Sequence, residues 1–177
     1  IVHTTPSYCE ELPGQVGGTG TAEIELQPAD IASDEVSWTI EPEGTSVGIG
    51  SYLTNILPGS YRADVITSHG CPAFGIGEVK VEIFSYNLVS TNGDQKNDNF
   101  RIDCISQFPD NNVKIFNRAG VLVYEADGYD NNDVVFKGVG EKGLYTIGND
   151  LPVGTYFYII DKRDGSKAKT GYLELVR

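Results

Sequence analysis

Oxygen-bearing side chains gather in one short segment, Asn92-Gly-Asp-Gln-Lys-Asn-Asp98, at roughly alternate positions. Calcium loops space carboxylate and amide oxygens in this way, but the full loop pattern with its bidentate Glu is absent. The other interpretation, which we favour, is an Asx-rich turn whose side chains bond the backbone. Calcium is the one cofactor that the sequence suggests, and its ligands would be Asn92, Asp94, Asn97 and Asp98.

Residue types that could support catalysis are sparse. The two histidines are His3 and His69, and neither lies in an H-E-x-x-H metal motif. No G-x-S-x-G nucleophile motif occurs, and Cys104 has no evident neighbouring base. A carboxylate pair for glycoside hydrolysis stays open, because the 25 Asp and Glu residues allow many pairings. We predict a protein that is not an enzyme.

The three cysteines are Cys9, Cys71 and Cys104. None belongs to a C-x-x-C pair, so we do not expect a structural zinc site. Cys9 and Cys71 bracket the first half of the chain, and a disulfide between them would stabilise a small exported domain. Whether their Cα atoms lie close enough is open at this point. We predict that Cys104 is a small buried strand residue.

Aromatic and basic residues near the end of the sequence are candidates for partner binding. The run Tyr156-Phe-Tyr-Ile-Ile160 puts aromatic residues on both faces of one strand. One face is then either covered by neighbouring strands or exposed for docking. A basic turn follows, with a solvated turn as its alternative, and a terminal alternating strand can pair with another chain at a sheet edge. The predicted partner-binding residues are Tyr156, Tyr158, Lys162, Arg163, Tyr172, Leu173, Leu175 and Arg177.

Strands must position these residues, because almost every apolar run has period two. Val36-Ser-Trp-Thr-Ile40 is an example in the first half, and Tyr172-Leu-Glu-Leu-Val176 is one in the second. No stretch keeps helical spacing for three turns. The density of strands and turns predicts an all-β fold built from β-sandwiches. The expected strands begin near Ala22, Val36, Tyr61, Val79, Asn99, Val113, Val121, Val134, Thr155 and Tyr172.

A repeated hairpin signal predicts two tandem immunoglobulin-like β-sandwich domains. Leu57-Pro-Gly-Ser-Tyr61 and Leu151-Pro-Val-Gly-Thr-Tyr156 each precede a strand, a Gly-containing turn and a closing strand. Immunoglobulin-like sandwiches often place a tyrosine corner at such a strand start. Pro-Gly turns before aromatic strands are also common in other β proteins, but here the whole hairpin recurs. We expect one domain at 1–84 and the other at 85–177.

Charge is distributed unevenly between the two halves. Residues 1–84 hold 12 acids and 2 bases, and residues 85–177 hold 13 acids and 11 bases, giving net charges of −10 and −2. This asymmetry supports two modules. Neither half offers the basic face that binding to phosphates needs, so we expect no nucleic-acid partner. No apolar run is long enough to predict a transmembrane segment. We expect the chain to begin inside a longer protein, because no signal peptide opens it.

Five blocks of the second half follow one another in a recognisable order. They are Tyr86 to Phe100, Val113-Lys-Ile-Phe-Asn-Arg-Ala-Gly120, Val123 to Asn131, Leu151 to Tyr158, and Gly171 to Arg177. Together they resemble the gliding motility-associated C-terminal domain, which is the type B sorting domain of type IX secretion substrates. Thr91, Gln95 and Ala119 depart from the Pro, Gly and Trp that are usual in that family. The missing Gly at Gln95 weakens the case for a tight metal-binding turn.

The resemblance implies recognition rather than catalysis. The second domain would be recognised in the periplasm by the type IX secretion machinery, pass through the outer membrane, and stay at the cell surface with a PorP/SprF-like outer-membrane protein. The first half is similar to the SprB-type repeats of large surface adhesins, through Cys9, Leu57 to Tyr61 and Cys71. A generic immunoglobulin-like spacer is the alternative for that half. A stand-alone adhesive or carbohydrate-binding module is the rival function for the chain.

Overall fold

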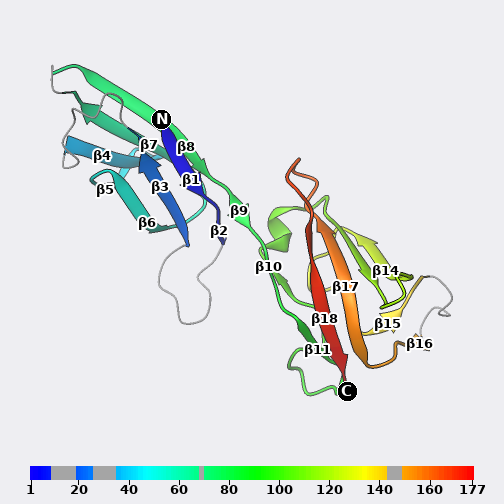
Figure 1. Ribbon diagram of the computed structural model, residues 1–177. Coiled ribbons are helices and arrows are strands. Elements are labelled where there is room, and N and C mark those ends of the chain that lie inside the picture. The colour runs from blue at the N-terminus through cyan, green and yellow to red at the C-terminus, as the bar shows by residue number, and fades with distance from the viewer. Residues whose placement is uncertain (9–18, 26–34, 68–69, 143–148) are drawn as a thin grey trace. The chain divides into compact units, whose positions relative to one another are not determined.

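The computed structural model describes residues 1–8, 19–25, 35–67, 70–142 and 149–177. Regular structure in these ranges is almost entirely β-strand, together with the short 3-10 helix η2 (Ile105–Gln107). The chain divides into two compact units, Ile1–Glu82 (unit 1) and Ile83–Arg177 (unit 2) (Figure 1). This division falls two residues before the predicted domain boundary, and the all-β prediction is confirmed.

Unit 1 consists mainly of two antiparallel sheets. One has the strand order β1-β3-β6, and the other has the order β5-β4-β7-β8. A short parallel pair, β2 with β9, completes the unit. The bounds are β1 (Val2–Thr5), β2 (Ser7–Tyr8), β3 (Gly20–Ile24), β4 (Val36–Glu41), β5 (Thr45–Ile49), β6 (Tyr52–Ile56), β7 (Gly59–Ile66), β8 (Pro72–Val79) and β9 (Val81–Glu82).

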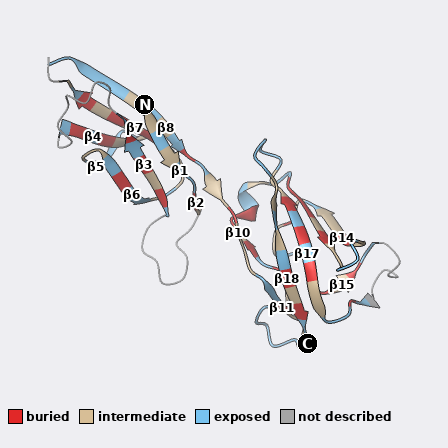
Figure 2. Cartoon of the chain, viewed as in Figure 1, coloured by how far each residue is buried: buried red, intermediate tan, exposed pale blue. Residues whose placement is uncertain are grey.

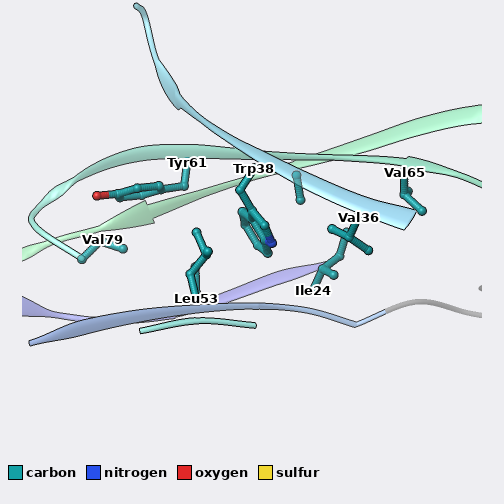
Figure 3. Close-up of a cluster of buried hydrophobic side chains, with 9 residues drawn as sticks. Ile24, Val36, Trp38, Leu53, Tyr61, Val65 and Val79 are labelled. Carbon is teal, nitrogen blue, oxygen red and sulfur yellow. The ribbon is translucent and has the colours of Figure 1, made fainter. Parts of the chain in front are cut away.

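The core of unit 1 lies between these two sheets. Figure 3 shows side chains from both sheets pointing toward one another around Trp38, which is fully buried. The Trp38 indole N–H donates to the backbone oxygen of Gly50 at 2.7 Å, so its polar atom is satisfied. The period-two pattern of the sequence is the cause, because it sends every second residue of each strand into this layer. The buried residues are Ala22, Ile24, Val36, Trp38, Leu53, Tyr61, Ala63, Val65 and Val79.

Unit 2 is organised around a five-stranded sheet with the order β11-β18-β17-β13-β14. Strand β11 pairs with β18 in parallel, and the other pairs are antiparallel. Two short pairs, β10 with β12 and β15 with β16, complete the unit. The bounds are β10 (Phe84–Ser85), β11 (Leu88–Ser90), β12 (Ile102–Asp103), β13 (Asn112–Phe116), β14 (Leu122–Asp127), β15 (Val139–Gly140), β16 (Asn149–Asp150), β17 (Gly154–Asp161) and β18 (Lys169–Val176).

Two expectations about unit 2 were wrong in detail. Strand β18 lies between β11 and β17, so Glu174 and Leu175 near its end pair with a strand on both sides, while the residues of β18 before them pair, among the described strands, with β17 alone. The predicted strand at Val134 to Phe136 is absent as regular structure. Phe136 is nevertheless fully buried, and its backbone oxygen accepts from the Phe100 amide at 2.9 Å. The apolar run therefore reflects burial in a loop rather than a strand.

Aromatic side chains fill the core of unit 2 on one side of the large sheet. The Phe100 ring lies 5.0 Å from that of Tyr158, and the Phe136 ring lies 5.2 Å from that of Tyr124. Alternate residues of β17 and β18 point into this core (Figure 2). Gly171 on β18 is needed here, because a Cβ at this position would overlap the Tyr158 hydroxyl.

Both units contain a tyrosine corner in the same place. The Tyr61 hydroxyl donates to the backbone oxygen of Leu57, and the Tyr156 hydroxyl donates to that of Pro152, each at 2.8 Å. Each tyrosine lies near the start of an eight-residue strand that forms an antiparallel hairpin with the next strand. Such a corner is typical of immunoglobulin-like sandwiches. The chain therefore holds two tandem immunoglobulin-like β-sandwich units.

Candidate interaction face of unit 2

The face of the five-stranded sheet that points away from the core carries an apolar row formed by Phe116, Phe157 and Tyr172. Phe157 is the register partner of both Phe116 on β13 and Tyr172 on β18, so the three side chains cross adjacent strands. Phe157 is 48% exposed and Tyr172 is 50% exposed. Ile159, two residues along β17, extends the row and is 37% exposed. Large apolar side chains gathered on a solvent face often mark an interaction site.

A groove of about 580 Å³ lies on this face. It is lined by Phe116, Asn117, Arg118, Gly120, Phe157, Tyr158, Ile159, Thr170, Gly171 and Tyr172. A second hollow of about 360 Å³ lies beside it and shares Asn117 and Arg118 with the groove. Its other lining residues are Ala119, Pro152, Val153, Gly154, Thr155 and Tyr156. Among these described lining residues, Arg118 is the only one that is charged at neutral pH.

The β13–β14 turn fixes the position of Arg118. The Asn117 side-chain oxygen accepts from the amides of Ala119 and Val121, each at 2.9 Å. Gly120 supplies the positive φ of 75° that this tight turn needs. The Arg118 guanidinium then donates to the Thr155 hydroxyl on β17 at 2.7 Å. The arginine is thus exposed but held at one side of the groove.

Four predicted partner-binding residues lie in the core instead of on this face. Tyr156, Tyr158, Leu173 and Leu175 are buried. The Tyr158 hydroxyl lies 2.8 Å from that of Ser85, so it is satisfied inside the unit. Tyr156 and Tyr158 border the hollow and the groove, but only a small part of each side chain is exposed there. Tyr172 lies in the candidate site together with Phe116, Arg118 and Phe157, which were not among the predicted residues.

The predicted basic residues form ion pairs within unit 2. The Lys162 ammonium lies 3.1 Å from Asp164 and 4.9 Å from the Phe108 ring centroid. Arg163 contacts Asp127 at 2.6 Å. Arg177 lies 3.5 Å from Asp150 and also donates to the Leu151 backbone oxygen at 2.8 Å. These three cations brace the turns and the end of the sheet, and their predicted role in partner binding stays a proposal.

These contacts lower the pKa values of two carboxyl groups, those of Asp164 and Asp127. Burial alone would raise the pKa of Asp164, but hydrogen bonds from Ser166 and Lys162 lower the pKa to about 2. The Asn112 side chain and the Arg163 guanidinium likewise lower the pKa of Asp127. In both cases the surrounding donors favour the ionised form.

The loop that the calcium hypothesis uses is folded by its own hydrogen bonds. One Asp98 carboxylate oxygen accepts from the Gly93 amide at 2.9 Å, and the other accepts from the Gln95 amide at 2.7 Å. Asp94 accepts from the Lys96 amide at 2.8 Å, and Asn92 accepts from the Asp94 amide at 3.2 Å. This is the Asx-turn arrangement, and within the described ranges no group of three or more His, Cys, Asp or Glu side chains could hold a metal ion.

The loop also covers one edge of the large sheet. The amide of Ser90 on edge strand β11 donates to the backbone oxygen of Asn97 at 2.7 Å. Asn97 and Gln95 adopt positive φ angles of 56° and 66°, which Asn tolerates better than most residues. The cluster of polar side chains therefore has a structural use in protecting an edge strand.

The cysteines differ from the prediction. Cys71 is free and exposed, which contradicts a bond between Cys9 and Cys71. Cys9 itself lies outside the described residues. Cys104, which we expected to be a buried residue without a partner, is disulfide-bonded. Sequence position gave no signal for this, because cysteine connectivity depends on the tertiary fold.

Comparison with known proteins adds to these observations. The family model described as "CHU_C Type IX secretion signal domain" matches residues 83–175. No curated protein matches the sequence. Two similar solved structures are "Crystal structure of DIP-gamma IG1+IG2" and "Crystal structure of Dpr11 IG1 bound to DIP-gamma IG+IG2". The first is 12% identical, with a TM-score of 0.31 over 88% of this chain and 86% of that one. The second is 12% identical, with a TM-score of 0.29 over 99% of this chain and 98% of that one.

Proposed function

Because the chain belongs to the family of CHU_C type IX secretion signal domains, we propose that unit 2 acts as a folded export signal for the protein that carries it. One observation supports this proposal more strongly than the others. The family match covers residues 83–175, and the compact unit spans Ile83–Arg177. The signal and the folding unit therefore coincide almost residue for residue. This coincidence favours recognition of a folded domain over recognition of a short linear peptide.

The secretion machinery would recognise unit 2 through its surface and carry the attached protein across the outer membrane. We further propose a PorP/SprF-like outer-membrane protein as the partner and retention at the cell surface as the outcome, as the similarity to type B sorting domains implies. The described ranges contain no helix long and apolar enough to cross a membrane. Under this proposal the machinery provides the route across the outer membrane.

Unit 1 would belong to the exported part of the protein. Its two sheets enclose a core of their own, and residues 1–84 carry a net charge of −10. A high net charge keeps a protein soluble and disfavours association between like units. We propose that unit 1 is an immunoglobulin-like spacer of a large surface protein of the adhesin or gliding-motility class.

A reporter fusion tests the proposal. A fluorescent protein with a periplasmic signal peptide is joined to residues 1–177 or, as the control, to residues 1–82, in a host with type IX secretion. We expect the first fusion to reach the cell surface or the medium and the second to stay in the periplasm. Equal retention of both fusions in the periplasm would count against unit 2 as an export signal.

A further inference from the structure

Arg118 differs from the other arginines in what it contacts. Each of the other four lies 2.6 to 3.5 Å from a carboxylate oxygen: Arg62, Arg101, Arg163 and Arg177. Across the described ranges, Arg118 has no such carboxylate partner, and its recorded hydrogen bond goes to the neutral hydroxyl of Thr155. A guanidinium carries five N–H donors. Arg118 is exposed, so donors remain free to bind another molecule.

Thr155 orients this guanidinium. The Thr155 hydroxyl donates its own proton to Glu174 Oε1 at 2.7 Å, which leaves its lone pairs to accept from Arg118. The arginine side chain is therefore held in one direction before any ligand arrives. Such preorganisation lowers the entropy lost on binding. A planar fork held in place is well suited to two parallel hydrogen bonds to a carboxylate.

The surroundings of Arg118 define the ligand further. The groove on one side of it contains the apolar row, and the hollow on its other side has Pro152 and Val153 in its lining. Val153 is 61% exposed. A ligand that fills the groove and reaches Arg118 must present a large apolar group beside one negative charge. Charge complementarity at Arg118 and burial of apolar surface would act together.

We propose that this groove binds an extended polypeptide segment of the secretion machinery, with an apolar side chain against Phe157 and Tyr172 and an Asp or Glu carboxylate on Arg118. The inference rests on the proposed function and states which surface of unit 2 the machinery contacts. A glycan fits less well, because its hydroxyl groups need replacement hydrogen bonds when they leave water. In the groove, the Asn117 oxygen is already used within its own turn, so apart from Arg118 the described lining offers the Asn117 amide nitrogen and the hydroxyls of Thr170 and Tyr172 as polar partners.

Photo-crosslinking in cells tests the proposal with the full chain. Tyr172 is replaced by a photoreactive phenylalanine analogue in the reporter fusion of residues 1–177, and Leu88, which is 40% exposed on β11, is replaced in the control. We expect an adduct from position 172 and not from position 88, and a crosslinked peptide that contains Asp or Glu. Arg118→Glu should lower the adduct yield and the exported fraction about tenfold or more, as expected for loss of one charge-assisted pair.

Matched variants separate charge from folding. Lys167→Glu makes the same change of charge at another exposed site of unit 2 and should leave export unchanged. Arg118→Lys should keep part of the export, because Lys retains the charge but not the fork. Changing the crosslinked carboxylate of the partner to Lys should restore the export of Arg118→Glu. Urea unfolding of Arg118→Glu should keep the cooperative transition of unit 2, because the side chain and its hydrogen bond to Thr155 are exposed.

The outcomes separate this inference from the proposed function. If the wild-type fusion stays in the periplasm, the proposed function fails. If the wild-type fusion is exported and Arg118→Glu is exported equally well, the groove inference alone is wrong. An adduct with a glycan or with a second copy of the chain would also overturn the inference. Export that depends on Arg118 together with an acidic crosslinked peptide would support it.

Discussion

The hydroxyl of Tyr129 is the best place to test whether unit 2 behaves as a folding unit of its own. Tyr129 is fully buried, and its hydroxyl donates to the Phe100 backbone oxygen and accepts from the Phe136 amide at 3.0 Å. Burial raises the pKa of Tyr129 far above its usual value, so the group stays protonated. The substitution Tyr129→Phe removes the hydroxyl and leaves the ring in place.

The magnitude follows from the two groups that lose a partner. Among the described residues, the Phe136 N–H has no acceptor other than the Tyr129 hydroxyl, and Phe136 is fully buried. A buried polar group without a hydrogen bond costs about 1–3 kcal/mol, so two such groups lower the free energy of unfolding by about 2–6 kcal/mol. With an m-value of about 1–2 kcal/mol/M in urea, the midpoint of unit 2 should fall by at least about 1 M.

The chain provides an internal control for this measurement. Trp38 is the only tryptophan and lies in the core of unit 1, so its fluorescence follows that unit. Circular dichroism follows both units. For Tyr129→Phe we expect the fluorescence transition, which reports unit 1, to stay at the same urea concentration. The transition of unit 2, followed by circular dichroism, should move to a lower urea concentration. Tyr124→Phe is the matched control, because Tyr124 is a buried tyrosine of the same core and its hydroxyl makes no hydrogen bond to another of the described residues. Equal shifts for the two variants would refute the reasoning.

Three further predictions concern charge, cysteines and metal. The pKa of Asp164 in the folded chain is about 2, below its usual value, so its ionised form stabilises unit 2 above about pH 4. The difference in melting temperature between wild type and Asp164→Asn should therefore shrink as pH falls from about 4 to about 2. A difference that stays constant over this range would contradict the prediction. Without reductant, a maleimide should label Cys71 and spare Cys104, and mass spectrometry of the labelled peptides would show the reverse if the assignment is wrong. Excess calcium or EDTA at fixed ionic strength should not shift the melting temperature, because both carboxylate oxygens of Asp98 already accept hydrogen bonds from backbone amides of the 92–98 loop. A rise in melting temperature with calcium would restore the calcium hypothesis.

Most of the fold could be predicted from the strand pattern, because a strand with one buried face shows alternating apolar and polar residues in the sequence. The strands near Val36, Tyr61, Val113 and Thr155 are all present. The order of strands in the sheet leaves no such trace. Strand β18 ends the sequence but lies inside the sheet, because the short parallel strand β11 pairs with its other side. Non-local pairing of this kind depends on the whole topology.

Of the four residues that define the candidate site, the sequence predicted only Tyr172, because it left open which face of β17 is buried. In β18, Leu173 and Leu175 alternate with Tyr172 and Glu174. The charged Glu174 indicates that Tyr172, two residues before it, lies on the outer face of the strand. Register then places Phe157 beside Tyr172 on that face. The importance of Arg118 was beyond the reach of sequence patterns, because its lack of a carboxylate partner is a property of the folded unit.

The dependence of export on unit 2 tests the central claim most directly. The measurement is the fraction of reporter that added protease degrades in intact cells, for the fusions to residues 1–177 and 1–82, in strains with and without the type IX machinery. We predict degradation only for the longer fusion in the strain that has the machinery. Protection of that fusion in both strains, or equal degradation of both fusions, would contradict the assignment of unit 2 as the signal.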